Sequence, residues 1–196
     1  RTFYFNISYY HEPVVRDVIA NVDTAYKMIV DDFGWLYFSV PQTIDLYVYK
    51  DANEYVSKTG MPRWSGGSAN LRKKAIYTFE QNDLFERVIV HELTHFIFDA
   101  YMGYPRNMGI NWLHEGIAVY QEKRILGNKW NMKSLKDLDN KGQLYSVDDL
   151  VKMKIDSDRD GSVALWYFCV ATLVAYIRTL EPEGFRVFTT NLRSYN

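Results

Sequence analysis

The stretch from Glu86 to Tyr101, which reads ERVIVHELTHFIFDAY, constrains the fold more than any other part of the chain. Apart from its charged ends and the histidines and glutamate at its centre, it is almost entirely apolar. A segment of this length that is apolar on most sides predicts a helix inside the protein rather than on its surface. We expect this helix to run from about Asp83 to Met102.

The centre of the predicted helix carries the pattern H-E-x-x-H at residues 91–95. On a helix, His91 and His95 lie one turn apart and on the same face, so their imidazoles can share one tetrahedral Zn²⁺. Glu92 is rotated by about 100° from His91, so it can touch a metal-bound water without being a ligand. The alternative is a pair of core histidines beside a buried glutamate, each of which would need its own polar partner.

A catalytic zinc ion usually has three protein ligands, so the histidine pair needs a third partner. Glu115 is the preferred candidate, on a predicted helix that spans residues 111–126 and has Gly116 to allow a close approach between helices. Asp99 is the competitor, one turn after His95. Because three ligands on consecutive turns of one straight helix do not easily converge, we expect Asp99 to have a supporting or helix-end role.

The rest of the chain predicts a mixed first half and a helical second half. The expected elements before the histidine helix are strands at 2–9 and 43–49, helices at 12–33 and 51–58, and a hairpin formed by residues 66–70 and the strand 75–79. The first helix has Pro13 in its first turn, and the second is capped by Asp51 and closed by Gly60. After it we expect a loop that contains Pro105, and then helices at 111–126, from Ser146, at 162–180 and at 182–192. The short helix from Ser146 begins with an S-x-x-D capping pattern. We therefore predict one α+β domain over 1–196. It has an N-terminal lobe with a small mixed β-sheet and helices (1–82), the histidine helix (83–102) and a mainly helical lobe (103–196).

The composition excludes several functional classes. The chain is 47% hydrophobic and 24% charged, which is typical of a globular protein. Its 23 basic and 24 acidic residues leave a net charge of -1, so no basic surface for nucleic acid is predicted. The lone cysteine, Cys169, excludes an internal disulfide, and we expect it to be a buried apolar side chain. The longest apolar helix, near residues 163–177, is expected to be too short to span a membrane.

Two motifs together bring a known family into view. HELTH at 91–95, followed by WLHEGIA at 112–118, resembles the gluzincins, specifically the peptidase MA-like domain related to thermolysin and the zinc aminopeptidases. The resemblance covers most of the chain and implies a zincin-like fold with Zn²⁺ as cofactor. It implies that His91, His95 and Glu115 are the metal ligands and that Glu92 is the catalytic base.

The same resemblance suggests roles for residues outside the two motifs. The segment with Gly67, Ser68 and Ala69 is similar to the family's edge strand, which binds the substrate backbone; a simple β-turn is the alternative. Tyr167 matches a tyrosine that faces the metal in the family and stabilises the oxyanion; packing in the core is the alternative. Independently of the resemblance, His114 neighbours the proposed ligand but points about 100° away on the helix, which favours a rim residue; contact with substrate is the other reading.

Two departures from the family pattern refine the prediction. Aminopeptidases of this type carry a glutamate that holds the substrate amino terminus, but residues 66–70 read GGSAN and contain none. This favours an endopeptidase. Four positions after the third ligand, where thermolysin has an acidic residue, this chain has Val119. We expect Asp99 or Glu122 to supply the supporting carboxylate instead.

These observations predict zinc-dependent hydrolysis of peptide bonds, with water activated by zinc and Glu92. The expected partner is a peptide or protein substrate, with no nucleic acid and no transmembrane segment. The alternative is a peptidase-like zinc-binding domain with a binding or scaffolding role and little turnover. Family members are often exported or membrane-tethered, and because the chain begins with Arg1 we expect a processed or partial product; the compartment stays open.

Overall fold

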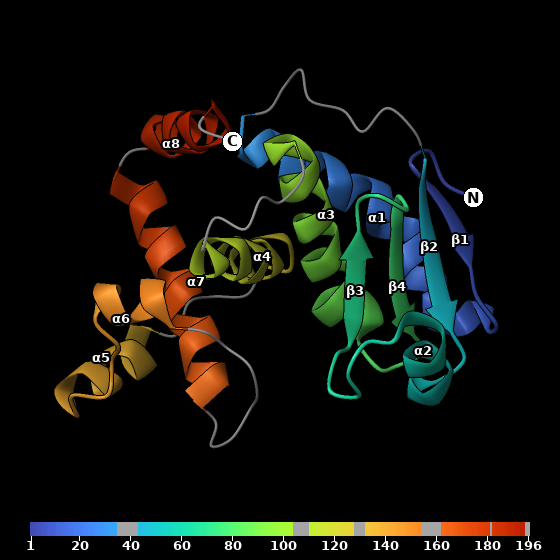
Figure 1. Ribbon diagram of the computed structural model, residues 1–196, viewed down its shortest axis with the longest axis horizontal. Coiled ribbons are helices and arrows are strands. Elements are labelled where there is room, and N and C mark those ends of the chain that lie inside the picture. The colour runs from blue at the N-terminus through green and yellow to red at the C-terminus, as the bar shows by residue number, and fades with distance from the viewer. Residues whose placement is uncertain (35–42, 104–109, 128–131, 154–161, 181, 195–196) are drawn as a thin grey trace. The chain divides into compact units, whose positions relative to one another are not determined.

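The computed structural model describes residues 1–34, 43–103, 110–127, 132–153, 162–180 and 182–194. The chain divides into two compact units, residues 1–104 with 192–196 and residues 105–191. The described part contains one mixed sheet of four strands and is otherwise mostly helical (Figure 1). The predicted α+β class with a small mixed sheet is therefore confirmed. The loop predicted around Pro105 lies outside the described residues.

The sheet belongs to the first unit and has the strand order β1-β2-β4-β3. Its strands are β1 (Phe5–Ser8), β2 (Ile44–Tyr49), β3 (Gly67–Asn70) and β4 (Ala75–Phe79). β1, β2 and β4 are parallel, whereas β3 runs antiparallel to β4 across the predicted hairpin. β3 therefore forms one edge of the described sheet.

The two faces of the sheet differ in chemistry because side chains alternate along each strand. Leu46 of β2 pairs with Ile76 of β4, and both side chains are fully buried. The next pair, Tyr47 and Tyr77, points to the opposite face and is only half-buried. One face therefore carries the core and the other carries tyrosines.

α1 (Glu12–Asp32) contributes a long apolar stripe to the core of the first unit. It begins with proline in its first turn, as the sequence predicts, and lies behind the sheet in the view of Figure 1. Its buried residues are Val15, Val18, Val22, Ala25, Tyr26, Ile29 and Val30. This spacing of three and four residues is that of one helix face.

α2 (Ala52–Thr59) packs against β2 and β4. Asp51 caps its N-terminus by accepting hydrogen bonds from the backbone N–H groups of Asn53 and Glu54. Gly60 ends it with φ +72°, a backbone conformation that favours glycine. Tyr55 is fully buried, with its ring 5.6 Å from that of Phe79. Both the cap and the terminating glycine were predicted.

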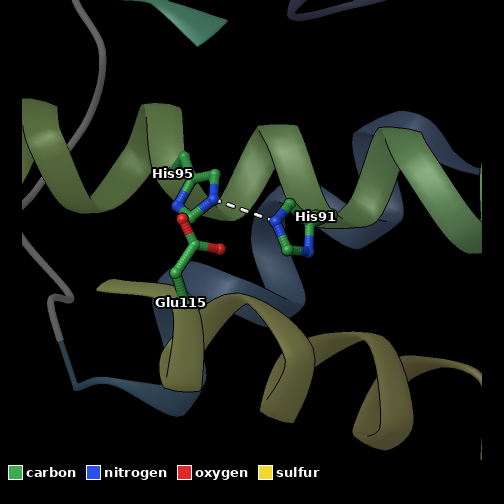
Figure 2. A group of neighbouring side chains, drawn as sticks. All are labelled: His91, His95 and Glu115. Atoms are coloured by element: carbon green, nitrogen blue, oxygen red, sulfur yellow. Dashed lines mark hydrogen bonds between the residues drawn. The ribbon is translucent and has the colours of Figure 1, made fainter. Parts of the chain in front are cut away.

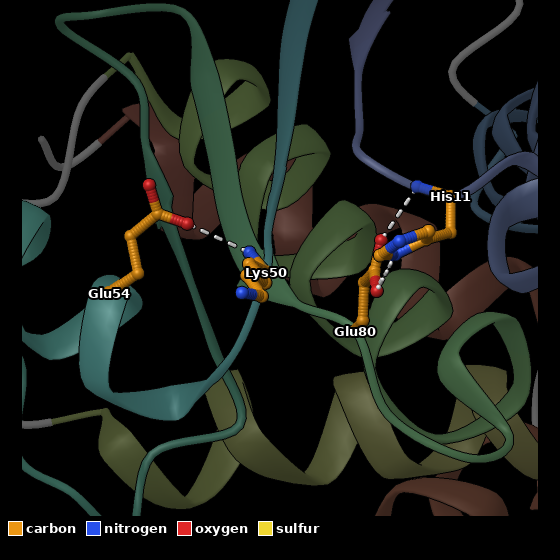
Figure 3. Close-up of polar contacts among 4 residues, drawn as sticks. All are labelled: His11, Lys50, Glu54 and Glu80. Carbon is orange, nitrogen blue, oxygen red and sulfur yellow. Dashed lines mark hydrogen bonds and ion pairs between the residues drawn. The ribbon is translucent and has the colours of Figure 1, made fainter.

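Two carboxylates hold the ends of strands to neighbouring helices (Figure 3). Glu80, which follows β4, accepts a 2.8 Å hydrogen bond from the backbone N–H of His11 and lies 2.7 Å from its Nδ1. Glu54 of α2 accepts a 2.9 Å hydrogen bond from the backbone N–H of Lys50, which follows β2. These contacts fix the starts of α1 and α2 relative to the strands.

The second unit is helical. Its elements are α4 (Asn111–Ile125), α5 (Met132–Asn140), α6 (Val147–Lys152), α7 (Ser162–Leu180) and most of α8 (Pro182–Ser194). Ser146 caps α6 through the backbone N–H of Asp149, as predicted. α4 and α6 pack on α7, and one core cluster combines Leu150, Trp166, Cys169 and Val170.

α7 corrects the expectation that the longest apolar helix is too short to span a membrane. Residues Val163–Leu180 form an uninterrupted helical window with a mean hydropathy of 1.7, and Thr172 does not break it because its hydroxyl donates to the backbone carbonyl of Phe168. By length and composition alone this window could cross a membrane. Core helices of soluble proteins pass the same test, and 28% of the window is buried here.

Candidate metal centre

The histidines lie on α3 (Val90–Met102), which follows a π-helical turn at Phe85–Ile89. The regular helix therefore starts later than predicted, because Asp83 adopts a left-handed backbone conformation with φ +55° and the next residues form the wider turn. Most of α3 is buried, and Thr94 satisfies its hydroxyl by donating to the carbonyl of Val90 at 2.7 Å. The apolar segment thus forms a helix of the core.

His91 and His95 face each other one turn apart. Their Nε2 atoms are 3.0 Å apart, and their rings are nearly perpendicular at 87°. Without a metal, one Nε2–H donates to the other Nε2. Two Nε2 ligands of a tetrahedral zinc ion, each at about 2.0–2.1 Å, would lie about 3.3–3.4 Å apart. The observed spacing is close to that value, so the pair fits a shared zinc ion with a small adjustment.

Glu115 lies in the first turns of α4 and is half-buried. His91, His95 and Glu115 each offer one ligand atom, and these atoms all lie within 4.8 Å of one another (Figure 2). Two imidazole nitrogens and one carboxylate oxygen are a donor set that suits zinc. Asp99, the competing carboxylate, is half-buried on α3 and does not belong to this group.

Gly116 has a different role from the one expected. A Cβ at this position would lie 2.8 Å from the carbonyl oxygen of Val170 and 2.9 Å from Cγ2 of Val174. The close helix approach that Gly116 permits is therefore to α7, within the second unit. The sequence indicated a tight contact but did not identify the helix that makes it.

Glu92 lies directly against the edge strand. A Cβ on Gly67 would be 2.9 Å from Cγ of Glu92 and 2.7 Å from Cγ1 of Val88. The absence of a side chain at position 67 is thus what allows β3 and the glutamate to approach. Val88 was missed in the sequence analysis, because nothing in its local pattern indicates contact with β3.

The segment predicted as a substrate ledge is a strand and not a simple turn. Ser68 and Ala69 pair with Tyr77 and Ile76 of β4. The start of β3 is held by the hydroxyl of Ser65, which donates to the carbonyl of Gly67 at 2.6 Å. The β-turn alternative is therefore wrong.

The remaining predicted residues lie on α4 and α7 of the second unit. His114 is half-buried beside the predicted ligand, as is Glu122 two turns later. Tyr167 packs beside the core of the unit, with its ring 5.3 Å from that of Trp166 in a T-shaped arrangement.

Burial raises the pKa of the Cys169 thiol, although a backbone hydrogen bond at Tyr145 opposes the shift. This favours the inert role expected for Cys169.

Comparisons with protein-family models, with curated proteins and with solved structures found no match to this chain. A functional assignment therefore depends on the chemistry of the residues and on their geometry. The histidine pair and the carboxylates around it are the strongest features for that purpose.

Proposed function

We propose that this chain is a zinc-dependent endopeptidase with a zincin-like fold, similar to the gluzincins. The observation that carries the proposal is the histidine pair on α3, whose Nε2 atoms face each other at 3.0 Å, with Glu115 as the third residue of the candidate ligand group. A half-buried glutamate next to the first histidine and an edge strand beside that glutamate add to it.

His91, His95 and Glu115 would hold the metal. When bound, zinc polarises a carbonyl group and lowers the pKa of a water molecule, which is the chemistry that peptide hydrolysis requires. The chain would contribute two imidazoles from α3 and a carboxylate from α4. Asp99 or Glu122 would orient these ligands by accepting hydrogen bonds from them.

Glu92 would act as the base. Its carboxylate would accept the proton of the attacking water and deliver it to the leaving amine. The contact with β3 supports this role, because Gly67 lets the strand that would hold the substrate lie against the side chain of Glu92.

β3 would bind the substrate. In the described part of the chain this strand pairs with β4 alone, so an extended peptide can add to its outer edge through backbone hydrogen bonds. Gly67, Ser68 and Ala69 would form this ledge, with His114 at its rim. Residues 66–70 contain no carboxylate for a substrate amino terminus, which favours internal peptide bonds.

Tyr167 would donate a hydrogen bond to the oxyanion. Such a donor typically stabilises the transition state by about 3–4 kcal/mol. A Tyr167→Phe variant keeps the ring that packs beside Trp166 and removes only the hydroxyl. A large drop in kcat with little change in stability supports the role, whereas an unchanged kcat assigns Tyr167 to packing alone.

The metal ligands are tested by measuring the zinc content of purified variants. The wild type is expected to retain about one zinc ion per chain, Glu115→Ala to lose it, and Asp99→Asn to keep it. Asp99→Asn is the matched control because it removes the other carboxylate that the sequence offers. Tight zinc binding by Glu115→Ala, or its loss in Asp99→Asn alone, would overturn the assignment of Glu115.

The catalytic role is tested by comparing the wild type with Glu92→Gln, both loaded with zinc, on a library of unstructured peptides. Removal of a general base should slow hydrolysis by about 10²–10⁴-fold while zinc binding stays intact. If the wild type hydrolyses no peptide faster than Glu92→Gln does, the chain is a zinc-binding domain without peptidase activity.

A further inference from the structure

The tyrosine face of the sheet in the first unit contains a pocket of about 430 Å³. It lies between the end of α2 and the edge strand β3. Its floor is formed by tyrosines of β2 and β4, and its walls by the following residues: Lys58, Thr59, Met61, Ser68, Ala69, Asn70 and Lys73. A volume of this size is within the range of small-molecule sites.

The floor is a cluster of three tyrosines. The rings of Tyr47 and Tyr77 are 5.4 Å apart and nearly parallel at 11°, and Tyr49 lies 6.4 Å from Tyr77 at 4°. Burial raises the pKa of both Tyr49 and Tyr77, and the neighbouring tyrosines add to the shift. Their hydroxyls therefore remain protonated at neutral pH and can donate hydrogen bonds.

The walls add positive charge from two directions. Lys58 comes from the last turn of α2 and Lys73 from the turn between β3 and β4, and Asn70 adds an amide. No aspartate or glutamate is among the residues that line the pocket in the described part of the chain.

Two carboxylates near the pocket are engaged elsewhere. Asp45 accepts a 3.0 Å hydrogen bond from Nδ2 of Asn6. Glu54 accepts hydrogen bonds from the hydroxyl of Tyr10 at 2.8 Å and from the backbone N–H of Lys50 at 2.9 Å. The residues that line the pocket therefore offer hydroxyl, amide and ammonium donors and no carboxylate, a set that favours an anionic group over a cationic one. Lys58 also interacts electrostatically with Glu54, one turn earlier on α2.

We propose that this pocket binds a carboxylate or phosphate group of a ligand, with Lys58 and Lys73 as counter-charges. The tyrosine hydroxyls would donate to the anion, and their rings would contact the apolar part of the ligand. The two lysines come from separate elements, the last turn of α2 and the turn between β3 and β4, which favours an anionic group that both ammonium groups can contact.

The anionic group could come from two sources. Gly67 faces Glu92, whereas its neighbour Ser68 lines the pocket. A peptide paired with β3 would alternate in the same way, so an acidic side chain could enter the pocket; this source rests on the proposed peptidase function. A free small anion is the other source and does not depend on that function.

Isothermal titration calorimetry separates these sources with two kinds of probe. One is inorganic phosphate. The other is a pair of short peptides that differ only in a central Glu or Gln. The binding of each probe is compared between the wild type and the double variant Lys58→Gln/Lys73→Gln. Lys50→Gln is the matched control, because Lys50 is exposed in the same unit and does not line the pocket.

The proposal expects binding of phosphate or of the Glu peptide that weakens by about tenfold or more in the double variant and is unchanged in Lys50→Gln. Preference for the Glu peptide over the Gln peptide identifies an acidic side chain as the ligand, and phosphate binding without that preference identifies a small anion. Tyr77→Phe, which keeps the ring and removes one donor, should weaken the same probe to a smaller extent.

The proposal is overturned if neither probe binds the wild type, or if the double variant binds as tightly as the wild type. The calorimetric result is independent of zinc content and of hydrolysis. A chain that binds zinc and cleaves peptides but ignores the charge of the probe would contradict the pocket and leave the proposed function in place.

Discussion

Gly67 shows how one residue can set the approach of a strand to a neighbouring side chain. Its lack of a Cβ places backbone of β3 against Glu92 and Val88. The neighbouring Gly66 differs, because a Cβ there would meet its nearest atom, Cγ2 of Val88, at an ordinary 3.5 Å. The two glycines therefore form a matched pair in which only one position is crowded.

We predict that Gly67→Ala lowers the hydrolysis rate far more than Gly66→Ala does. The new methyl group must displace Glu92 or Val88, and overpacking of this kind typically costs about 1–3 kcal/mol. Peptide hydrolysis and thermal unfolding of both variants measure the effect. Equal activity of the two variants would show that the position of Glu92 does not depend on β3.

At the scale of elements, the second unit depends on the packing of α4 against α7. Gly116 leaves no room for a side chain in this contact, because Val170 presents a backbone oxygen that cannot move away as a flexible side chain can. The buried stripe of α7 that faces inward includes Trp166, Val170 and Val174.

We predict that Gly116→Ala destabilises the protein by about 1–3 kcal/mol, measured by chemical denaturation. On an exposed helix the same change would stabilise by about 1 kcal/mol, because alanine has the higher helix propensity. Val174→Ala, combined with Gly116→Ala, should restore only part of the loss, since the backbone contact remains. A stabilised Gly116→Ala variant would contradict the close packing of the two helices.

The tyrosines of β2 and β4 give the sheet a predictable response to alkaline pH. The folded protein holds the pKa of Tyr49 and Tyr77 above the ordinary value of 10.0, mainly through burial. In the unfolded chain these groups lose their protons first, so their ionisation favours unfolding. Their contribution to stability is complete below pH 10 and decreases as the pH rises through the folded-state pKa.

We therefore predict that the free energy of unfolding decreases above pH 10, and that the decrease is smaller in Tyr49→Phe/Tyr77→Phe. Urea titrations at a series of pH values measure this difference. Tyr176→Phe, which changes an exposed residue on α7, serves as the control. An equally steep decrease in the double variant would contradict the protective effect of burial.

At the scale of the whole molecule, a bound metal should stabilise the fold because the unfolded chain does not preserve the ligand geometry. At a zinc concentration about 100 times the Kd the expected gain is about 2.7 kcal/mol. For a chain of this length, that corresponds to an increase in Tm of roughly 5–10 °C.

Differential scanning calorimetry with zinc and after chelation measures this shift. It should disappear in His95→Gln and persist in His11→Gln, which changes a histidine on the surface at the start of α1. A shift of the same size in both variants would place the stabilising metal at another site.

The sequence by itself determined the local features of this protein. The i, i+4 spacing of His91 and His95 implies a shared face on any helix, and the alternation along β2 implies one apolar and one tyrosine-bearing face. The caps at Asp51 and Ser146 were likewise predicted, because each depends on contacts within a few residues. Local geometry follows from the chain because the groups involved are covalently close.

Only the tertiary structure decided which distant segments meet. It brought Gly67 against Glu92 and Gly116 against Val170, and it assembled Lys58, Lys73 and three tyrosines around one pocket. No periodicity encodes these contacts, since each depends on how strands and helices pack across many intervening residues. The H-E-x-x-H pattern predicted a metal-binding pair, but the packing decided that its glutamate lies against an edge strand, the position from which a base could act on a bound peptide.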